Sequence, residues 1–215
     1  ENTFGKGLVQ NVYQVDNTEG GEFKTHWFRR RYRWNEDGSL QLDGRRIELK
    51  ELRIFTTVDL ATSLKTWADY TVISTWGEMQ IGKNTYLFLL DVVRDKFDSP
   101  ETKAQIAAAI AKWDPDFVGV ESAGYQLSCV QDLLAQGLPI RKIESDKDKI
   151  SRARAVTPYC EAGFYVFPDE APWLTDCERE LFGFPFAKHD DFVDTVSSTM
   201  EFIAFGEIGV PGDID

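Results

Sequence analysis

The chain has 215 residues, of which 42% are hydrophobic and 28% charged, and its formal net charge is −12. These values are typical of a folded domain with its own core and exclude a disordered chain, and no run approaches the ~20 apolar residues of a membrane span. The acidic balance predicts that any binding of nucleic acid is weak and depends steeply on salt.

The first fifty residues are rich in turn signals, such as Asp43-Gly44, and hold two short candidate strands at 25–33 and 41–49. The chain begins without methionine and shows no basic and then apolar leader, so we expect it to be part of a longer protein. The division we expect is a connector that wraps onto the domain, a main domain and a C-terminal tail, at 1–50, 51–207 and 208–215.

Beyond residue 50 three β-rich apolar runs follow one another with short connections, at 52–60, 70–78 and 81–93. This pattern predicts an antiparallel meander. A helix is expected next at 99–113, with Ser99 as its N-cap and Pro100 in its first position.

From residue 117 onward, strand and helix patterns alternate. Strands are predicted at 117–121, 139–143 and 164–167, and helices at 125–136, 149–161, 171–182 and 190–205. A meander followed by this alternation predicts an α/β fold, with a mixed central sheet covered by helices on both faces.

Three carboxylates, of Asp190, Asp191 and Asp194, crowd the first turn of the last predicted helix. The helix dipole tolerates acids there by about 0.3–1 kcal/mol each, but like charges at helical spacing repel one another. A bound cation would remove that repulsion, which makes the cluster a candidate metal site. Taken alone, Asp190 has an ordinary explanation as a helix cap.

Two further acids, Asp59 and Glu121, each end an apolar strand. Strand ends of open α/β sheets are where ligands gather. Asp59 alone would be a turn cap, and Glu121 alone would pair with an arginine such as Arg154. Three separated segments that each place acid at the end of an apolar run favour one shared metal site instead.

Oxygen donors of this kind select Mg²⁺ or Mn²⁺ over zinc. Two such ions about 4 Å apart activate a water and stabilise the leaving oxygen in a phosphoryl displacement. We expect Asp59 to bridge the two ions and Asp191 to bind metal directly, with Asp190 or Asp194 in support. His189, which precedes the cluster, is expected to be a neighbour without a metal bond.

Basic residues lie between the second and third acidic segments and at one turn of the meander. Functionally they would hold DNA phosphates beside the metals. The alternatives are a solvated helix face for the first group and a plain hairpin tip for the turn. The candidate DNA-binding residues are Lys147, Lys149, Arg152, Arg154 and Lys83.

Four segments in this order resemble the C-terminal nuclease domain of the large terminase subunit of tailed bacteriophages, over roughly residues 23–205. They are Val58-Asp59-Leu60-Ala61 with Ala68–Ile73, Glu121-Ser122-Ala123-Gly124, Asp146–Gly163, and Phe184–Asp194. The resemblance implies an RNase H-like (retroviral integrase-like) fold. It also implies that Asp59 is the first metal-binding acid, Glu121 the second, and the Asp190–Asp194 group the third.

The activity implied by the resemblance is metal-dependent endonucleolytic cleavage of concatemeric viral DNA during genome packaging, leaving 3′-hydroxyl ends. The implied partners are double-stranded DNA, an N-terminal ATPase motor domain, the portal and the small terminase subunit, with no membrane. The implied location is the host cytoplasm, in a packaging complex and not in the mature virion. No Gly-x-x-x-x-Gly-Lys-[Ser/Thr] phosphate loop occurs in the sequence, so this chain is expected to cut DNA without translocating it.

Two alternatives stay open at this point. One is an exonuclease or a Holliday-junction resolvase of the same fold, because resolvases carry an Asp-x-x-Asp pair like that of Asp191 and Asp194. The other is a non-catalytic module that docks DNA or a motor domain, in which the acids are only structural.

Overall fold

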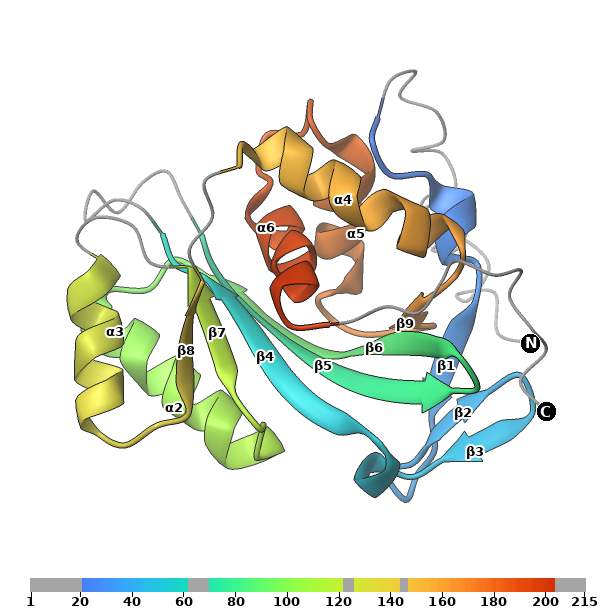
Figure 1. Cartoon of the computed structure of the whole chain (residues 1–215), viewed down its shortest axis with the longest axis horizontal. Helices are drawn as coiled ribbons and strands as arrows, with labels where there is room; N and C mark the ends of the chain where they lie inside the picture. The colour runs from blue at the N-terminus through green and yellow to red at the C-terminus, as the bar shows by residue number, and fades with distance from the viewer. Residues whose placement is uncertain (1–20, 62–69, 122–125, 144–146, 204–215) are drawn as a thin grey trace, which may run out of the picture.

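The structure is a computed structural model that describes residues 21–61, 70–121, 126–143 and 147–203 (Figure 1). Its centre is a nine-stranded mixed sheet, in the order β3-β2-β1-β9-β6-β5-β4-β7-β8. The strands are β1 (Arg31–Trp34), β2 (Leu40–Leu42), β3 (Arg45–Ile47), β4 (Arg53–Asp59), β5 (Thr71–Ile81), β6 (Asn84–Asp95), β7 (Val118–Glu121), β8 (Ile140–Ile143) and β9 (Tyr165–Pro168). No helix within the described ranges is long and apolar enough to cross a bilayer.

The helices lie on both faces of this sheet, as predicted (Figure 1). Their bounds are α2 (Ser99–Trp113), α3 (Gln126–Ala135), α4 (Lys149–Glu161), α5 (Leu174–Gly183) and α6 (Asp191–Ser197), with short 3₁₀ turns at η2 (Thr25–Phe28), η3 (Leu49–Glu51) and η4 (Ser198–Glu201). The α/β class and the antiparallel meander of β4, β5 and β6 are confirmed.

Side-chain alternation along the meander divides the core into two layers. Phe55 and Val72 pack with α4, α5 and α6 on one face, whereas Val58 and Ile73 pack with α2 and α3 on the other. Because successive side chains of a strand point to opposite faces, the residue after Val58 points to the α6 face. This places Asp59 under α6.

The segment predicted as a connector contributes three strands to the sheet. β1 pairs in parallel with β9, and β2 and β3 continue from it as antiparallel neighbours. The turn between β2 and β3 needs left-handed backbone at Asp43 and Gly44, with φ of 48° and 83°. This Asp-Gly turn is typical of a tight hairpin whose twist matches its strands.

The predicted bounds of α2 are confirmed, but its predicted N-cap and the predicted end of the last helix are wrong, and α5 begins three residues later than predicted. Asp98, not Ser99, caps α2: its carboxylate accepts from the Glu101 amide while the Glu101 side chain accepts from the Asp98 amide, a reciprocal capping box. The last helix stops at Ser197 and tightens into η4, instead of continuing to residue 205. Of the sequence motifs, Ala68-Asp69, Ser122–Gly124 and Asp146 lie outside the described residues, as do residues 1–20 and the tail at 208–215.

Candidate active site

Two acids come to one edge of the sheet because their strands are parallel neighbours. The register pairs Thr57 with Gly119 and Val58 with Val120, so the next residues, Asp59 and Glu121, lie side by side at the strand ends. Neighbouring strands are about 4.8 Å apart. Both side chains point to the α6 face, since the residues before them, Val58 and Val120, pack on the other face.

Helix α6 carries the third group of acids onto this edge, and buried hydroxyls hold it there. The Thr57 hydroxyl donates to the Thr195 carbonyl over 2.9 Å and accepts from the Trp76 indole N–H over 2.9 Å. The Ser74 and Thr195 hydroxyls are 2.7 Å apart. Because these groups are fully buried, each needs its partner, and the network fixes α6 over β4 and β5.

Two cations of α4 connect the acids across this edge. The Lys149 ammonium lies 2.6 Å from an oxygen of Asp190 and 2.5 Å from one of Asp194. The Arg152 guanidinium reaches Glu121 at 2.6 Å and the second oxygen of Asp194 at 2.9 Å. The side chain of Asp194 is only 8% exposed, and a carboxylate so buried requires this pairing.

The remaining two acids, Asp59 and Asp191, have no such partner. Neither makes an ion pair or a hydrogen bond with another side chain of the described residues. Burial raises the pKa of Asp59 well above its usual range, the negative charges of Asp194, Asp191 and Glu121 add to this, and Lys149 opposes it. The pKa of Asp191 is raised to about 6, chiefly by burial and then by Glu180.

At Asp194 and Lys149, too, the effect of burial on the pKa opposes that of neighbouring opposite charges. Burial also raises the pKa of Asp194, against the attraction of Lys149 and Arg152. For Lys149, burial alone would lower the pKa, but Asp194 and Asp190 outweigh it and the pKa is raised. Lys149 therefore stays charged, and its charge partly offsets the accumulated negative charge of the edge.

The start of α6 is capped by a residue of another helix. Asp190 occupies the N-cap position, yet its side chain makes no capping hydrogen bond and turns to Lys149 instead. The Phe192 amide donates to Glu180 of α5 over 3.0 Å. Asp190 is thus the N-cap by position, as its ordinary explanation has it, but its side chain does not cap the helix and is available to the acidic edge.

The chemistry of this donor set fits a divalent metal, although the acids are spread around the two cations. Among the described residues no three acidic, histidine or cysteine side chains already converge on one point that would hold an ion. Two partly buried carboxylates with raised pKa values and no side-chain partner in the described ranges, those of Asp59 and Asp191, are nevertheless what a hard cation stabilises. Asp194, Glu121 and Asp190 stand beside them as further oxygen donors.

The other predicted site residues take different positions. Lys147 is exposed just before α4, and Arg154 forms an exposed pair with Glu22 at 2.7 Å instead of with Glu121. Lys83 lies at the tip of the β5–β6 hairpin, nine residues along β5 from Val72, the partner of Asp59. Nine residues of a strand span about 30 Å, so Lys83 lies outside the acidic edge. DNA binding by Lys83 stays a prediction.

Sequence reasoning did not identify Arg94, Glu180 and Tyr70. The Arg94 guanidinium is paired with the buried Glu180 carboxylate and lies 3.5 Å over the Tyr70 ring. The ring of His189 meets Tyr70 edge-on at 5.0 Å, which places His189 here. The register offers a signal: Asp59 pairs with Val72, and Val72 pairs with Arg94, so Arg94 ends its strand at the same edge.

Solved structures with this fold support the architecture. The large terminase nuclease from thermophilic phage G20c with bound zinc has a TM-score of 0.59 and 15% identity, covering 83% of this chain and 96% of that chain. The same nuclease with bound magnesium gives a TM-score of 0.59 at 14% identity, with 86% and 99% covered. The large terminase from another thermophilic bacteriophage, in complex with ATP-γ-S, gives 0.53 at 14% identity, with 72% and 41% covered.

Sequence comparison assigns the family. No curated protein sequence matches the chain. The family model described as the terminase RNase H-like domain matches residues 56–204, which include β4 with Asp59, β7 with Glu121, and α6 with its acids. The chain belongs to the terminase RNase H-like domain family.

Proposed function

We propose that this chain is the nuclease part of a phage terminase large subunit, a metal-dependent endonuclease that cleaves concatemeric viral DNA during packaging. The observation that carries the proposal is the pair of partly buried carboxylates of Asp59 and Asp191, which have no side-chain partner among the described residues, at an edge that also holds Glu121 and Asp194. Uncompensated buried charge is costly, and a divalent cation is the counter-charge that suits carboxylate oxygens.

The metal would be Mg²⁺ or Mn²⁺, Asp59, Glu121, Asp191 and Asp194 would hold it with Asp190 in support, and two ions would serve catalysis. The ions supply an activated water and stabilise the leaving oxygen of the displaced phosphate. The related G20c nuclease is described with bound magnesium and with bound zinc, which supports a divalent cofactor.

The residues of the chain itself position the substrate. Lys149 and Arg152 each touch two carboxylates and stand between the acids, so they are the cations best placed to bind oxygens of the scissile phosphate. Lys147 and Arg154, exposed on the same segment, extend this basic face toward neighbouring phosphates. The Thr57 hydroxyl, which donates to the Thr195 carbonyl, and the Thr195 hydroxyl, which bonds with that of Ser74, keep Asp194 in register with Asp59.

The assembly around this domain is also part of the proposal. The large terminase of which this chain covers 41% is described in complex with ATP-γ-S, which supports a separate ATP-binding part in a longer subunit. We propose that an N-terminal ATPase motor supplies the DNA, that the portal and the small terminase subunit complete the complex, and that it acts in the host cytoplasm.

Nicking of supercoiled plasmid tests the activity. With Mg²⁺ or Mn²⁺ the wild-type chain should open closed circles, which an exonuclease does not do, and Asp59→Asn should abolish this. Asp132→Asn is the matched control, because Asp132 is an exposed acid on α3, away from the acidic edge, that pairs with Lys103. The proposal would be contradicted if the wild type nicks plasmid no more than Asp59→Asn does, or if the wild type strongly prefers four-way junctions over linear duplex.

A further inference from the structure

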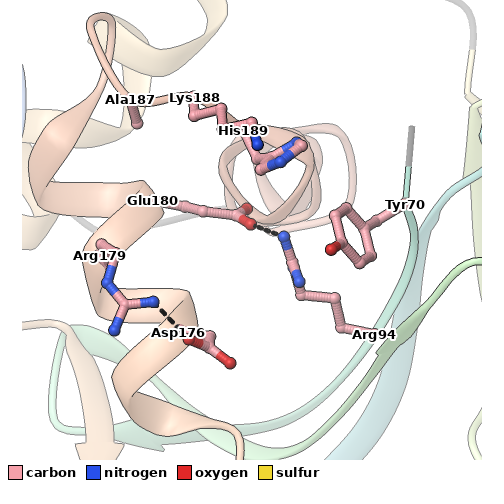
Figure 2. Close-up of a pocket in the computed structure, with 8 residues that line it drawn as sticks. All are labelled: Tyr70, Arg94, Asp176, Arg179, Glu180, Ala187, Lys188 and His189. Carbon is pink, nitrogen blue, oxygen red and sulfur yellow. Dashed lines mark hydrogen bonds and ion pairs between the residues drawn. The ribbon is translucent and has the colours of Figure 1, made fainter. Parts of the chain in front are cut away.

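A pocket of about 210 Å³ lies beside the acidic edge, between the end of β6, helix α5 and the segment that leads into α6 (Figure 2). We call it the Arg94 pocket. Figure 2 shows the rings of Tyr70 and His189 on one side of the pocket and the ion pair of Arg179 and Asp176 on the other. The ion pair of Arg94 and Glu180 lies between them.

The buried ion pair holds a rigid guanidinium group in the wall of this pocket. The side chains of Arg94 and Glu180 are only 14% and 6% exposed. Arg94 is also stacked on Tyr70, while the second oxygen of Glu180 accepts from the Phe192 amide. Arg94 is therefore held in one orientation from two sides, and a pre-ordered guanidinium loses little entropy when it binds an anion.

The outer part of the Arg94 pocket carries cations that an anion can recruit. Lys188 is exposed and makes no ion pair with the residues that the structure describes. Arg179 pairs with Asp176 at 2.6 Å, but both side chains are more than half exposed, and such surface pairs contribute only about 0–1 kcal/mol. With three cations against two acids, the pocket is locally basic in a chain of net charge −12.

The position of the Arg94 pocket relates it to the acids. Arg94 lies across from Val72, and Val72 across from Asp59, so two strand spacings, about 10 Å, separate them. The chain also runs directly from Lys188 and His189 into Asp190. A nucleic-acid strand rises about 3.4 Å per nucleotide along the duplex axis, and successive phosphates are farther apart than this, so a phosphate within about three nucleotides of the acidic edge falls at the pocket.

We infer that the Arg94 pocket holds one backbone phosphate of the cleaved DNA strand, within about three nucleotides of the scissile bond. Arg94, Arg179 and Lys188 bind the phosphate oxygens, and the Tyr70 and His189 rings face the adjoining sugar or base. The inference rests on the proposed function, because it takes DNA as the substrate. A fixed second phosphate contact sets the direction in which the strand crosses the acids.

Removing the two exposed cations tests this without touching the acidic edge. The pocket variant is Arg179→Ala/Lys188→Ala, and the control is Arg46→Ala/Lys50→Ala at β3 and η3, toward the far edge of the sheet. The control likewise removes one exposed arginine paired with acids and one exposed lysine that has no ion pair in the described structure. Binding of a short labelled duplex is followed by fluorescence anisotropy over a series of salt concentrations with chelator present, so that no cleavage occurs.

The pocket variant should bind the duplex about three- to tenfold more weakly at low salt, and the slope of log Kd against log salt should fall by about 1, the contribution of one phosphate. The control should retain the wild-type slope. Equal affinities and slopes for pocket and control variants would overturn the inference. So would a pocket variant that loses binding of inorganic phosphate in calorimetry but keeps wild-type binding of duplex, since the pocket would then serve free phosphate.

Failure of this inference is distinguishable from failure of the proposed function. If the wild type nicks plasmid but the pocket variant keeps the wild-type salt slope, the proposed nuclease activity holds and the inference about the pocket is contradicted. If the pocket variant has a reduced salt slope but the wild type never nicks plasmid, the pocket is a DNA contact and the proposed nuclease activity is contradicted. Thermal melting of both double variants checks that each is folded.

Discussion

The ammonium group of Lys149 lies 2.5 Å from a carboxylate oxygen of Asp194, and the same group lies 2.6 Å from Asp190. A cation of the chain thus stands against acids that we propose as metal ligands. Lys149 and a divalent ion compete for the same negative charge, because either one relieves the repulsion among the acids. Three experiments follow from this arrangement and from the hydrogen bonds beneath it.

Replacing Lys149 with methionine should strengthen metal binding and weaken cleavage. The substitution keeps the length of the side chain but removes the competing charge, so Mn²⁺ should bind about tenfold more tightly, which is about 1.4 kcal/mol. Cleavage should fall, because the proposed phosphate contact is lost. Calorimetric titration with Mn²⁺ and plasmid nicking measure the two effects.

The control for that substitution is Lys112→Met, since Lys112 pairs with Asp91 at 2.6 Å away from the acidic edge. It should change neither quantity. Unchanged or weaker Mn²⁺ binding in Lys149→Met would show that the lysine helps to build the metal site and does not compete with the ion.

The metal-free protein should become more stable as the pH falls through about 6. The pKa of Asp191 is raised to about 6 in the folded chain, against an ordinary value near 3.9, so between these values the folded state binds more protons than the unfolded state. Stability therefore rises as the pH falls through this window and levels off below it. Asp59 and Asp194, whose pKa values are also raised, act in the same direction.

Thermal melting in chelator from about pH 7.5 to about pH 5 measures this dependence. Each 1 kcal/mol should appear as a rise of about 2–4 °C in a chain of this size. Asp191→Asn should flatten the curve, and saturating Mg²⁺ should do the same because it favours the ionised carboxylates. Melting that is independent of pH in the wild type would contradict the raised pKa that we assign to the partly buried Asp191.

The hydroxyl of Thr57 should matter for both stability and metal binding. Thr57→Val keeps the shape of the side chain but leaves the buried Trp76 N–H without its acceptor and the Thr195 carbonyl without its donor. We expect a loss of about 2–3 kcal/mol in the free energy of unfolding, with weaker Mn²⁺ binding because α6 is held less firmly.

Denaturant unfolding and Mn²⁺ titration check this expectation, with Thr57→Ser as the matched variant. Serine restores the hydroxyl and should recover most of the loss. If serine and valine destabilise the protein equally, the methyl group of Thr57 and its packing carry the effect, and the hydrogen bonds do not.

The acids of the candidate site were predictable because they interrupt apolar patterns. Asp59 and Glu121 follow buried strands, and Asp190, Asp191 and Asp194 open an amphipathic run. Strand ends in a mixed sheet meet at shared edges, so the pattern indicates that these acids lie close together. It does not indicate which acids are paired: that depends on how α4 turns Lys149 and Arg152 toward the edge, and this orientation is a property of tertiary packing.

The surroundings of the site were harder to predict. In the sequence, Arg94 is an ordinary polar residue at the end of a strand, and Glu180 is one of several charged residues in a helix. They become a buried ion pair only because the fold brings β6 and α5 together. The hydroxyls of Thr57, Ser74 and Thr195 read as ordinary strand and helix residues. Short-range patterns carry no information about such contacts, since Ser74 and Thr195 are 121 residues apart in the chain.

The wide spacing of the acids along the chain has a consequence for the cell in which the protein is made. Asp59 and Glu121 leave the ribosome well before Asp194, and without α6 the sheet edge holds too few oxygen donors for metal-assisted hydrolysis. On the proposed function, a chain cut short before α6 should therefore not cleave DNA.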